Sequence, residues 1–246
     1  MKISIITVCY NSGKTIEDTI KSVISQTHKN VEYIIIDGES TDNTLAIIDK
    51  YKNNVSKFIS EPDKGLYDAM NKGISLSTGN IIGLLNSDDV FAGITVLEEI
   101  AEFHNTHQIE ASVGNIVQTK EGKIIRTFNS KNWNPEKLTK GFMPPHPSIF
   151  FTSTILQQLG GYKTNYKIAA DYELIIRYFL KNKIIWKYSG ITTTSMAVGG
   201  VSSSGASSYR LITSEIGKAF NENKISYSPT RVKLRGFIKI IELLKL

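Results

Sequence analysis

The sequence predicts an α/β fold in which a mostly parallel sheet is flanked by helices. Short apolar runs without polar alternation, as found in strands buried on both faces, alternate with segments whose apolar residues recur at helical spacing. Such an alternation implies parallel strands joined by right-handed crossovers. The chain has 246 residues, of which 41% are hydrophobic and 21% charged, so it is long enough to bury a sheet of this kind.

The first half of the chain is predicted to hold four strands, each followed by a helix. The strands are expected at Lys2 to Tyr10, Val31 to Ile36, Val55 to Ile59 and Ile81 to Leu85. The helices that follow carry the apolar pairs Ile16 and Ile20, Ile47 and Ile48, Met70 and Ile74, and Leu97 and Ile100. Ser12 is placed to cap the first of these helices.

The second half is predicted to be less regular and partly antiparallel. Thr119 to Gly122 separates two β-rich segments, Ala111 to Gln118 and Lys123 to Phe128, which predicts a hairpin. Asn132 to Pro147 is rich in proline, glycine and polar residues and is expected to be a loop. The remaining predicted elements are a strand at Ser148 to Thr152, a helix at Ala169 to Lys181 and a glycine- and serine-rich loop at Gly199 to Ser208.

Four small polar residues, Asn86-Ser87-Asp88-Asp89, directly follow the apolar run Ile81 to Leu85. At the end of a parallel strand they would lie at the carboxyl edge of the sheet, where open α/β folds bind ligands. Adjacent aspartates repel each other unless a cation compensates them, and oxygen ligands of this kind suit Mg²⁺ or Mn²⁺. The alternative is a turn in which Asp88 or Asp89 caps the next helix.

Two further predicted strands also end in polar side chains, Thr7 and Tyr10 on the first and Asp37 on the second. Because parallel strands bring their carboxyl ends to one edge, these residues should converge with Asp88 and Asp89. Asp37 has two candidate roles, as an acceptor for a base or ribose and as the anchor of the turn that follows it. Glycine-rich phosphate loops are absent after the first strand, so a phosphate ligand would be neutralised largely by a metal.

Asp171 is the candidate acid in the second half of the chain. It lies in the first turn of the helix predicted at Ala169 to Lys181, where the helix dipole alone favours a carboxylate. The glycine turn Gly160-Gly161 precedes it, and a tight turn followed by an acid can build the wall of a pocket. His146 lies between prolines, where it is either a ligand or a loop residue.

Composition limits the class of protein. The single cysteine, Cys9, excludes a disulfide framework and a cysteine-based metal site. No signal-peptide pattern follows Met1 and no run approaches the ~20 apolar residues of a spanning helix, so we expect a cytoplasmic protein. All but one unit of the net charge of +6 belongs to residues 224–246, so the sequence predicts no basic face for nucleic acid.

Residues 206–246 are predicted to form a helical, basic, amphipathic tail. One helical stripe carries Leu234, Phe237, Ile238, Ile241 and Leu244, with Arg235, Lys239 and Glu242 opposite. Basic amphipathic helices bind anionic lipid surfaces, which would place the protein at the inner face of the cell membrane as a peripheral protein. The alternative is a C-terminal helix that is docked on the domain.

Five motifs, in this order, carry a resemblance to a known family: TVCYNS (7–12), DGESTDNT (37–44), EPDKGLYDAMNKG (61–73), LLNSDD (84–89), and GGY (160–162) with AADYEL (169–174). Together they resemble the inverting family 2 glycosyltransferases of the GT-A fold, and among these the bacterial enzymes that extend O-antigen or capsule repeat units. The resemblance implies one GT-A-like catalytic domain over residues 1–205. Residues 1–105 would be its nucleotide-sugar-binding half and residues 106–205 its acceptor half.

The resemblance also implies roles for individual residues. It places Thr7, Tyr10, Asp37, Asp63, Lys64 and Asn86 at the nucleotide, Asp88 and Asp89 at a divalent metal, and Asp171 as the catalytic base. The sequence departs from the family pattern at Asn86 and Gly38, where the metal motif and the second-strand motif commonly have an aspartate. The Q-x-x-R-W stretch of processive members is missing, which favours the addition of one sugar.

The activity that the resemblance implies is a metal-dependent, inverting transfer of one sugar in bacterial surface polysaccharide synthesis. The donor would be a UDP-hexose or a UDP-N-acetylhexosamine, and the acceptor a saccharide or a lipid-linked saccharide. One alternative is a sugar-1-phosphate nucleotidyltransferase, although this class would be expected to carry an N-terminal glycine-rich phosphate loop, and none is present. The other alternative is a non-catalytic module that binds nucleotide sugars or a membrane surface.

Overall fold

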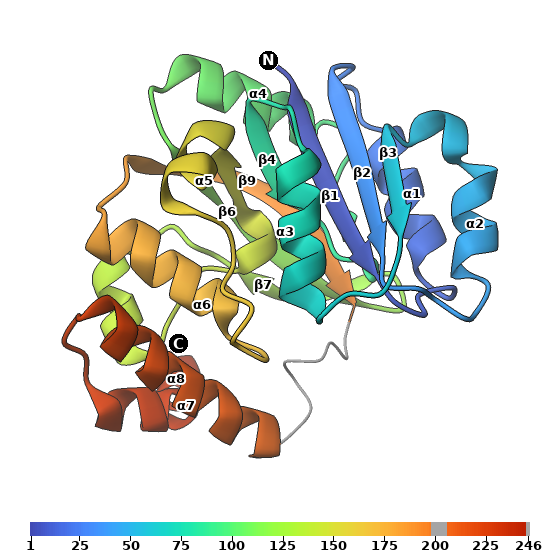
Figure 1. Ribbon diagram of the computed structural model, residues 1–246. Coiled ribbons are helices and arrows are strands. Elements are labelled where there is room, and N and C mark those ends of the chain that lie inside the picture. The colour runs from blue at the N-terminus through green and yellow to red at the C-terminus, as the bar shows by residue number, and fades with distance from the viewer. Residues whose placement is uncertain (198–205, 245–246) are drawn as a thin grey trace.

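Figure 1 shows the computed structural model of the chain, which describes residues 1–197 and 206–244. Nine strands within these residues form one sheet in the order β3-β2-β1-β4-β8-β6-β9-β5, with β7 paired to β6. The strands are β1 (Ile3–Cys9), β2 (Val31–Asp37), β3 (Lys57–Ser60), β4 (Ile81–Leu84), β5 (Asp89–Phe91), β6 (Ala111–Lys120), β7 (Lys123–Phe128), β8 (Ile149–Thr152) and β9 (Trp186–Ala197). The predicted α/β class is confirmed.

The strands β3, β2, β1 and β4 are parallel to one another, as the first half of the sequence predicts. Along β1 and β2 the register runs from Ile3 opposite Val31 to Cys9 opposite Asp37. Neighbouring residues of β1 belong to separate hydrophobic clusters on the two faces of the sheet, so the strand is buried on both sides. Double-sided burial explains why these strands are almost continuously apolar until their carboxyl ends.

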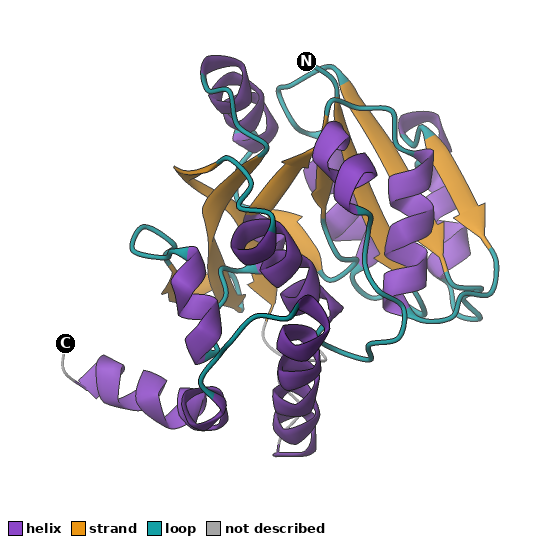
Figure 2. Cartoon of the chain, turned by 60° about the vertical axis from the view of Figure 1, so that its left-hand side comes forward, coloured by secondary structure: helices purple, strands orange, loops and turns teal. Residues whose placement is uncertain are grey.

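Helices cover both faces of the sheet (Figure 2). They are α1 (Ile16–Ile24), α2 (Thr44–Lys50), α3 (Leu66–Leu76), α4 (Val96–Thr106), α5 (Ser153–Leu159), α6 (Ala170–Ile175), α7 (Ala206–Asn223) and α8 (Pro229–Leu244), with short turns η1 (Lys52–Asn54), η2 (Pro135–Lys140) and η3 (His146–Ser148). After Ile175, α6 continues as a π helix, η4 (Ile176–Lys181). One cluster packs α1, α2 and α4 on one face, and the other packs α3, α6 and α7 on the opposite face.

The second half of the sheet is partly antiparallel. The predicted hairpin is confirmed as β6 and β7, and β8 pairs antiparallel with both β4 and β6. The sequence analysis assigned no element to Trp186–Ala197, which forms β9 between β6 and β5. Its sequence is rich in serine and threonine and lacks an apolar face, so backbone pairing on both sides, and not side-chain patterning, stabilises it as a strand.

Two local predictions are wrong. The sequence predicts Ser12 as a side-chain cap, but α1 begins at Ile16, and the Ser12 hydroxyl contacts the Tyr10 carbonyl and the Ser87 hydroxyl instead. The loop predicted from Asn132 to Pro147 contains the helical turn η2 and enters η3, because Leu138 and Pro147 pack into the interior.

The C-terminal segment packs on the rest of the protein beside α6 (Figure 1). Ile216, Ala219 and Phe220 of α7 have no exposed surface and share a hydrophobic cluster with β1, and α8 adds Val232 to it. The alternative prediction, a C-terminal helix docked on the domain, therefore holds for α7 and for the start of α8.

Of the loop predicted at Gly199 to Ser208, residues 199–205 lie outside the described residues and 206–208 begin α7. None of the helices in the described part of the chain combines the length and apolar sequence needed to cross a bilayer.

Candidate active site

The segments that follow β1, β2 and β4 meet at one edge of the sheet, as predicted. The backbone N–H of Asn11 donates to the Ser40 hydroxyl at 2.8 Å, and the hydroxyls of Ser12 and Ser87 lie 2.8 Å apart. Asn11 adopts the left-handed conformation (φ 49°), and its side-chain oxygen accepts the Thr41 N–H at 2.8 Å. These contacts hold three distant parts of the sequence in one local framework.

Two of the predicted nucleotide contacts are buried. Asp37 has no exposed surface, and its carboxylate accepts hydrogen bonds from the Ser40 hydroxyl at 2.5 Å and the Ser60 hydroxyl at 2.7 Å. Thr7 is equally buried and accepts a hydrogen bond from the Tyr33 hydroxyl at 3.2 Å. Asp37 therefore anchors the turn after β2 to the end of β3, which is the second of its two candidate roles. Direct contact of either side chain with a nucleotide stays a prediction.

Tyr10, Gly38 and Asp63 lie together at this edge, and Tyr10 is 64% exposed. A Cβ atom placed on Gly38 would lie 2.6 Å from the Asp63 Oδ2 atom and 3.6 Å from the Tyr10 ring. Asp63 is oriented by the Gly65 N–H, which donates to its Oδ1 atom at 2.7 Å, and Lys64 beside it is exposed. The departure from the family pattern at Gly38 thus has a physical reason, since any side chain there would displace Asp63.

The turn after β4 leads into β5 and not into a helix. Asp89 is the first residue of β5 and pairs with Met196 of β9, whereas the next helix, α4, begins only at Val96. The alternative in which Asp88 or Asp89 caps a helix is therefore wrong.

The turn after β4 holds two carboxylates and an amide side by side in the sequence. Asp88 is exposed, Asp89 is buried, and the Asn86 amide donates to the Asp89 Oδ2 atom at 3.2 Å. Burial, and then the neighbouring charge of Asp88, raises the pKa of Asp89 to about 7, so this pair of acids lacks a compensating positive charge. Within residues 1–197 and 206–244 no three acidic, histidine or cysteine side chains are grouped to hold a metal by themselves. Water or a diphosphate would have to supply further oxygen ligands.

Asp171 lies in the first turn of α6 and is half-buried. Its Oδ1 atom accepts the N–H of Tyr172 at 2.7 Å. Burial raises the pKa of Asp171 to about 6, and the charge of Glu215 on α7 also acts to raise it. A carboxylate with this pKa is ionised at neutral pH and accepts a proton more readily than an ordinary aspartate, which suits a general base.

Glu173, the other acid on this helix, is committed to ion pairs. It has no exposed surface, and its carboxylate lies 3.0 Å from both the Arg177 guanidinium and the Lys163 ammonium, while the Asn223 amide donates to it at 3.1 Å. Two residues apart on a helix, Glu173 and Asp171 point in different directions. Glu173 therefore has a structural role, and Asp171 is the candidate base.

The first turn of α3 connects the base to the strand-end residues. Asp63 and Lys64 directly precede this turn, and Tyr67 within it donates its hydroxyl hydrogen to the carbonyl of Ile168. Burial, and then the negative charge of Asp171, raises the pKa of Tyr67, which reflects the proximity of the two side chains. Asp171 therefore lies near the first turn of α3, which follows the predicted nucleotide residues Asp63 and Lys64 in the sequence.

Asn71 and Tyr162 belong to this part of the site, although no role for them is predicted from the sequence. Asn71 on α3 holds Tyr162 by two hydrogen bonds, to its carbonyl at 2.7 Å and from its N–H at 2.8 Å. The Tyr162 ring stacks on Tyr67, and its hydroxyl lies 2.6 Å from His146 Nε2, whose pKa burial lowers to about 4. Of its two candidate roles, His146 fills that of a structural loop residue. Tyr67 and Asn71 are four residues apart in one motif. This spacing places both on the same face of a helix and could have predicted that they contact the same part of the protein.

Comparison with known proteins identifies the family. Residues 4–161 match the model of the family described as Glycosyl transferase family 2. The chain belongs to this family, as the five motifs predict. A UDP-Glc:alpha-D-GlcNAc-diphosphoundecaprenol beta-1,3-glucosyltransferase from Escherichia coli is 34% identical over 161 residues, which are 64% of this chain and 61% of that protein.

Solved structures of low sequence identity share the fold. S. aureus TarS 1–349 in complex with UDP-GlcNAc superposes with a TM-score of 0.71 at 20% identity, over 89% of this chain and 66% of that one. The mannosyltransferase PcManGT from Pyrobaculum calidifontis, in complex with GDP-Man and Mn²⁺, has a TM-score of 0.65 at 15% identity, over 95% and 68%. The GT-A-like fold is confirmed, and the chain spans about two thirds of the length of these proteins.

Gly38→Ala should weaken UDP binding without unfolding the protein, because the new methyl group must displace Asp63 from the edge of the sheet. We expect the dissociation constant for UDP in isothermal titration calorimetry to rise about tenfold, as expected for the loss of one polar contact. Gly93→Ala is the matched control, since a Cβ at this position meets no atom within 4 Å. Equal UDP affinity in the two variants would show that Asp63 does not contact the nucleotide.

Proposed function

We propose that this protein transfers one sugar from a UDP-sugar to a saccharide or lipid-linked saccharide, with inversion at the anomeric carbon. The proposal rests chiefly on one observation, that the half-buried carboxylate of Asp171 lies near Tyr67 in the first turn of α3, the helix that directly follows Asp63 and Lys64. An inverting displacement needs a donor held at one side and a proton acceptor at the other. Tyr10 and Asp63 would bind the donor, and Asp171 would face the acceptor.

Two similar proteins support a UDP-sugar as the donor. The name of the E. coli relative states that it uses UDP-Glc, and TarS has been solved with UDP-GlcNAc. Both a hexose and an N-acetylhexosamine therefore occur among the donors of similar proteins. Contacts to a single hydroxyl or acetamido group decide between such donors, and each contributes on the order of 1–3 kcal/mol.

A lipid-linked acceptor is supported by the same relative, whose acceptor is a GlcNAc attached to diphosphoundecaprenol. For this chain the corresponding proposal is a step in the assembly of a bacterial surface polysaccharide, of the O-antigen or capsule type. Residues that follow β5 would supply the acceptor side, because the candidate base Asp171 and Tyr162, whose pKa its charge affects, both come from this half of the chain.

The reaction follows from the position of Asp171. Its carboxylate accepts the proton of the acceptor hydroxyl while the hydroxyl oxygen forms a bond to the anomeric carbon. The bond from that carbon to the diphosphate breaks, and its electron pair leaves with UDP. Because attack and departure occur on opposite faces of the carbon, one displacement inverts the configuration.

Asp88, with help from Asp89 and Asn86, is proposed to hold a divalent metal, Mn²⁺ or Mg²⁺. The uncompensated charge of the two aspartates supports this assignment, as does the Mn²⁺ in the PcManGT structure. When bound, the metal supplies positive charge for the departing diphosphate. With few ligands from the protein, we expect the metal and the nucleotide to bind cooperatively.

The two alternative functions have less support. A sugar-1-phosphate nucleotidyltransferase is disfavoured by family membership as well as by the missing glycine-rich loop. Asp171 is a half-buried carboxylate with a raised pKa. A non-catalytic module that only binds its ligand does not need such a group. Family membership and the position of Asp171 thus both favour sugar transfer.

A donor panel tests the proposed function. We expect the protein to release UDP from one of the common UDP-hexoses or UDP-N-acetylhexosamines in the presence of Mn²⁺ and a lipid-diphosphate-linked GlcNAc acceptor. Release should fall at least tenfold when the metal is removed by EDTA, and the anomeric proton coupling of the product should report inversion. Formation of a nucleotide sugar from UTP and a sugar 1-phosphate would instead identify a nucleotidyltransferase.

Asp171→Asn should reduce turnover by about 10²- to 10⁴-fold with little change in UDP-sugar affinity, because the amide keeps the shape but cannot accept the proton. In the unaltered protein kcat/KM should fall tenfold per pH unit below about pH 6, where Asp171 becomes protonated, and level off above it. Glu173→Gln is the control and should lower the melting temperature while the turnover of the folded protein persists. An active Asp171→Asn variant would contradict the assignment.

We also propose that α8 contacts an anionic membrane surface. Its docked face holds Val232 and Arg235, whose guanidinium donates to the Thr213 hydroxyl at 2.7 Å, so Arg235 serves docking and not lipid binding. Leu234 is 54% exposed, and further apolar residues follow it in the sequence at helical spacing. Exposed apolar residues beside cations such as Arg231 and Lys233 are typical of surface-binding helices.

Leu234→Glu should reduce co-sedimentation with vesicles that contain phosphatidylglycerol several-fold, because it adds a negative charge to the exposed side of α8 without disturbing the docked side. Ile185→Glu is the control, since Ile185 is 61% exposed but precedes β9 at the amino edge of the sheet, away from the site. If both variants sediment like the unaltered protein, α8 is not the membrane contact.

A further inference from the structure

Glu215 on α7 is a buried carboxylate that the reaction described above does not use. It is 8% exposed, and it accepts three backbone hydrogen bonds, from the N–H groups of Lys167 at 2.7 Å, Ile168 at 3.0 Å and Ala169 at 2.9 Å. These three residues form the chain that leads into α6. Among the described residues, none of the ion pairs includes Glu215, so its hydrogen bonds to this segment are its main polar contacts.

We propose that Glu215 is the positioning residue of the Asp171 base. The proposal rests on the proposed function of Asp171 and extends it to the C-terminal helices. By fixing the backbone of residues 167–169, Glu215 sets the direction in which the first turn of α6 presents the Asp171 carboxylate. Its charge also keeps Asp171 a better proton acceptor than an aspartate in water.

The segment before α6 is held from two sides. Glu215 binds its N–H groups from α7, while Tyr67 on α3 donates to its carbonyl at Ile168. A segment of this kind has no regular backbone pairing of its own, so an external carboxylate is what satisfies its N–H groups. Hydrogen bonds to an ionised group are about twice as strong as neutral ones, which suits a part that must stay rigid during proton transfer.

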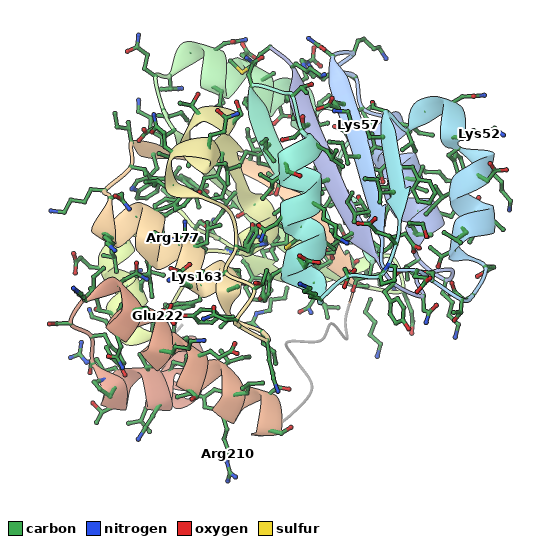
Figure 3. The ribbon with its side chains drawn as sticks, in the orientation of Figure 1. Lys52, Lys57, Lys163, Arg177, Arg210 and Glu222 are labelled. Atoms are coloured by element: carbon green, nitrogen blue, oxygen red, sulfur yellow. The ribbon has the colours of Figure 1, made fainter. Side chains whose placement is uncertain are left out.

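Contacts of other residues on helix α7 also fix its position. Ile216, the next residue, is fully buried, and one to two turns further on Glu222 pairs with the Lys163 ammonium at 2.8 Å. Asn223 donates to Glu173 on α6 at 3.1 Å. Figure 3 shows Lys163 and Arg177 close to Glu222, where α6 and α7 meet. These contacts would hold α7 in place even without Glu215, so a loss of Glu215 can be examined in a folded protein.

The groups that face Asp171 make its proton affinity sensitive to Glu215. They are Tyr67 from α3, Tyr162 from the segment after α5, Tyr172 on α6 itself and Glu215 from α7. The three tyrosines stay neutral near pH 7, because burial raises the pKa of each, so Glu215 supplies the charge among them. Two cations act on these tyrosines, Arg235 of α8 on Tyr172 and Arg177 on Tyr162. Burial is the main reason for the raised pKa of Asp171, and replacing Glu215 by glutamine removes the smaller contribution that the negative charge of Glu215 adds to it.

The inference connects the C-terminal helices to the chemistry. The family model matches residues 4–161, so Asp171 and Glu215 both lie beyond the matched part. A change that shifts α7 or α8 would be transmitted to the base through three hydrogen bonds. Acceptor transfer, and not donor binding, is the step that such a shift would alter.

The test compares Glu215→Gln with Glu222→Gln in the full chain. Glu215→Gln should lower kcat about 10- to 100-fold, leave the dissociation constant for UDP within about twofold, and move the acid limb of the pH–rate profile to lower pH. Glu222→Gln removes another carboxylate of the same helix. Because Ile216 and Asn223 still anchor α7 in this variant, kcat and the acid limb should stay within about twofold of the unaltered protein. If Glu215→Gln matches the unaltered protein in both readouts, or Glu222→Gln reproduces its effects, Glu215 is not a positioning residue.

A measurement without turnover separates this inference from the proposed function. Carbon-13 NMR titration of the Asp171 carboxyl should give a lower pKa in Glu215→Gln than in the unaltered protein. The amides of residues 167–169 should exchange with deuterium at least tenfold faster. An unchanged titration with unchanged exchange overturns the inference even if the protein transfers sugars. Both changes in a protein that transfers no sugar would support the placement by Glu215 and reject the proposed reaction.

Discussion

Burial of the parallel strands on both faces is the constraint on which this structure depends. Strands β1, β2 and β4 carry few polar side chains along their length, because each of their faces packs against its own hydrophobic cluster. Polar residues are therefore concentrated where the strands end, and the parallel direction brings these ends to one edge. The turns after β1, β2 and β4 then bond to one another and form the framework of the site.

The second half of the chain completes the site by a different principle. No parallel strand delivers Asp171 to the edge. It is placed by an irregular segment that is held by Tyr67 on one side and Glu215 on the other. The proposed base thus depends on helices from both ends of the chain, α3 and α7. The strand ends and the segment before α6 are thus held by different parts of the structure. This arrangement suits a reaction in which donor and acceptor approach from different directions.

The sequence predicted most of the first half and less of the second, for physical reasons. Apolar runs and their polar ends follow from local burial, so β1, β2 and β4 and the meeting of the segments that follow them were predictable. Strand β9 was not, because its serine- and threonine-rich sequence is stabilised by neighbours that are remote in the chain. Asp171 was a candidate from its place in the first turn of a predicted helix, but its role as the base came only from resemblance to a family. Glu215 and Asn71 could not be assigned roles, since their partners are backbone groups that no side-chain pattern reveals.

The central claim is that the donor binds at the carboxyl edge of the parallel strands, with Asp171 on the acceptor side. Anomalous diffraction from crystals grown with UDP and Mn²⁺ tests it most directly. The account predicts a manganese signal in contact with a carboxylate oxygen of Asp88 and with the diphosphate, and UDP density beside Tyr10 and Asp63. Manganese or UDP bound at another surface of the chain, with Asp88 free of both, would contradict the account.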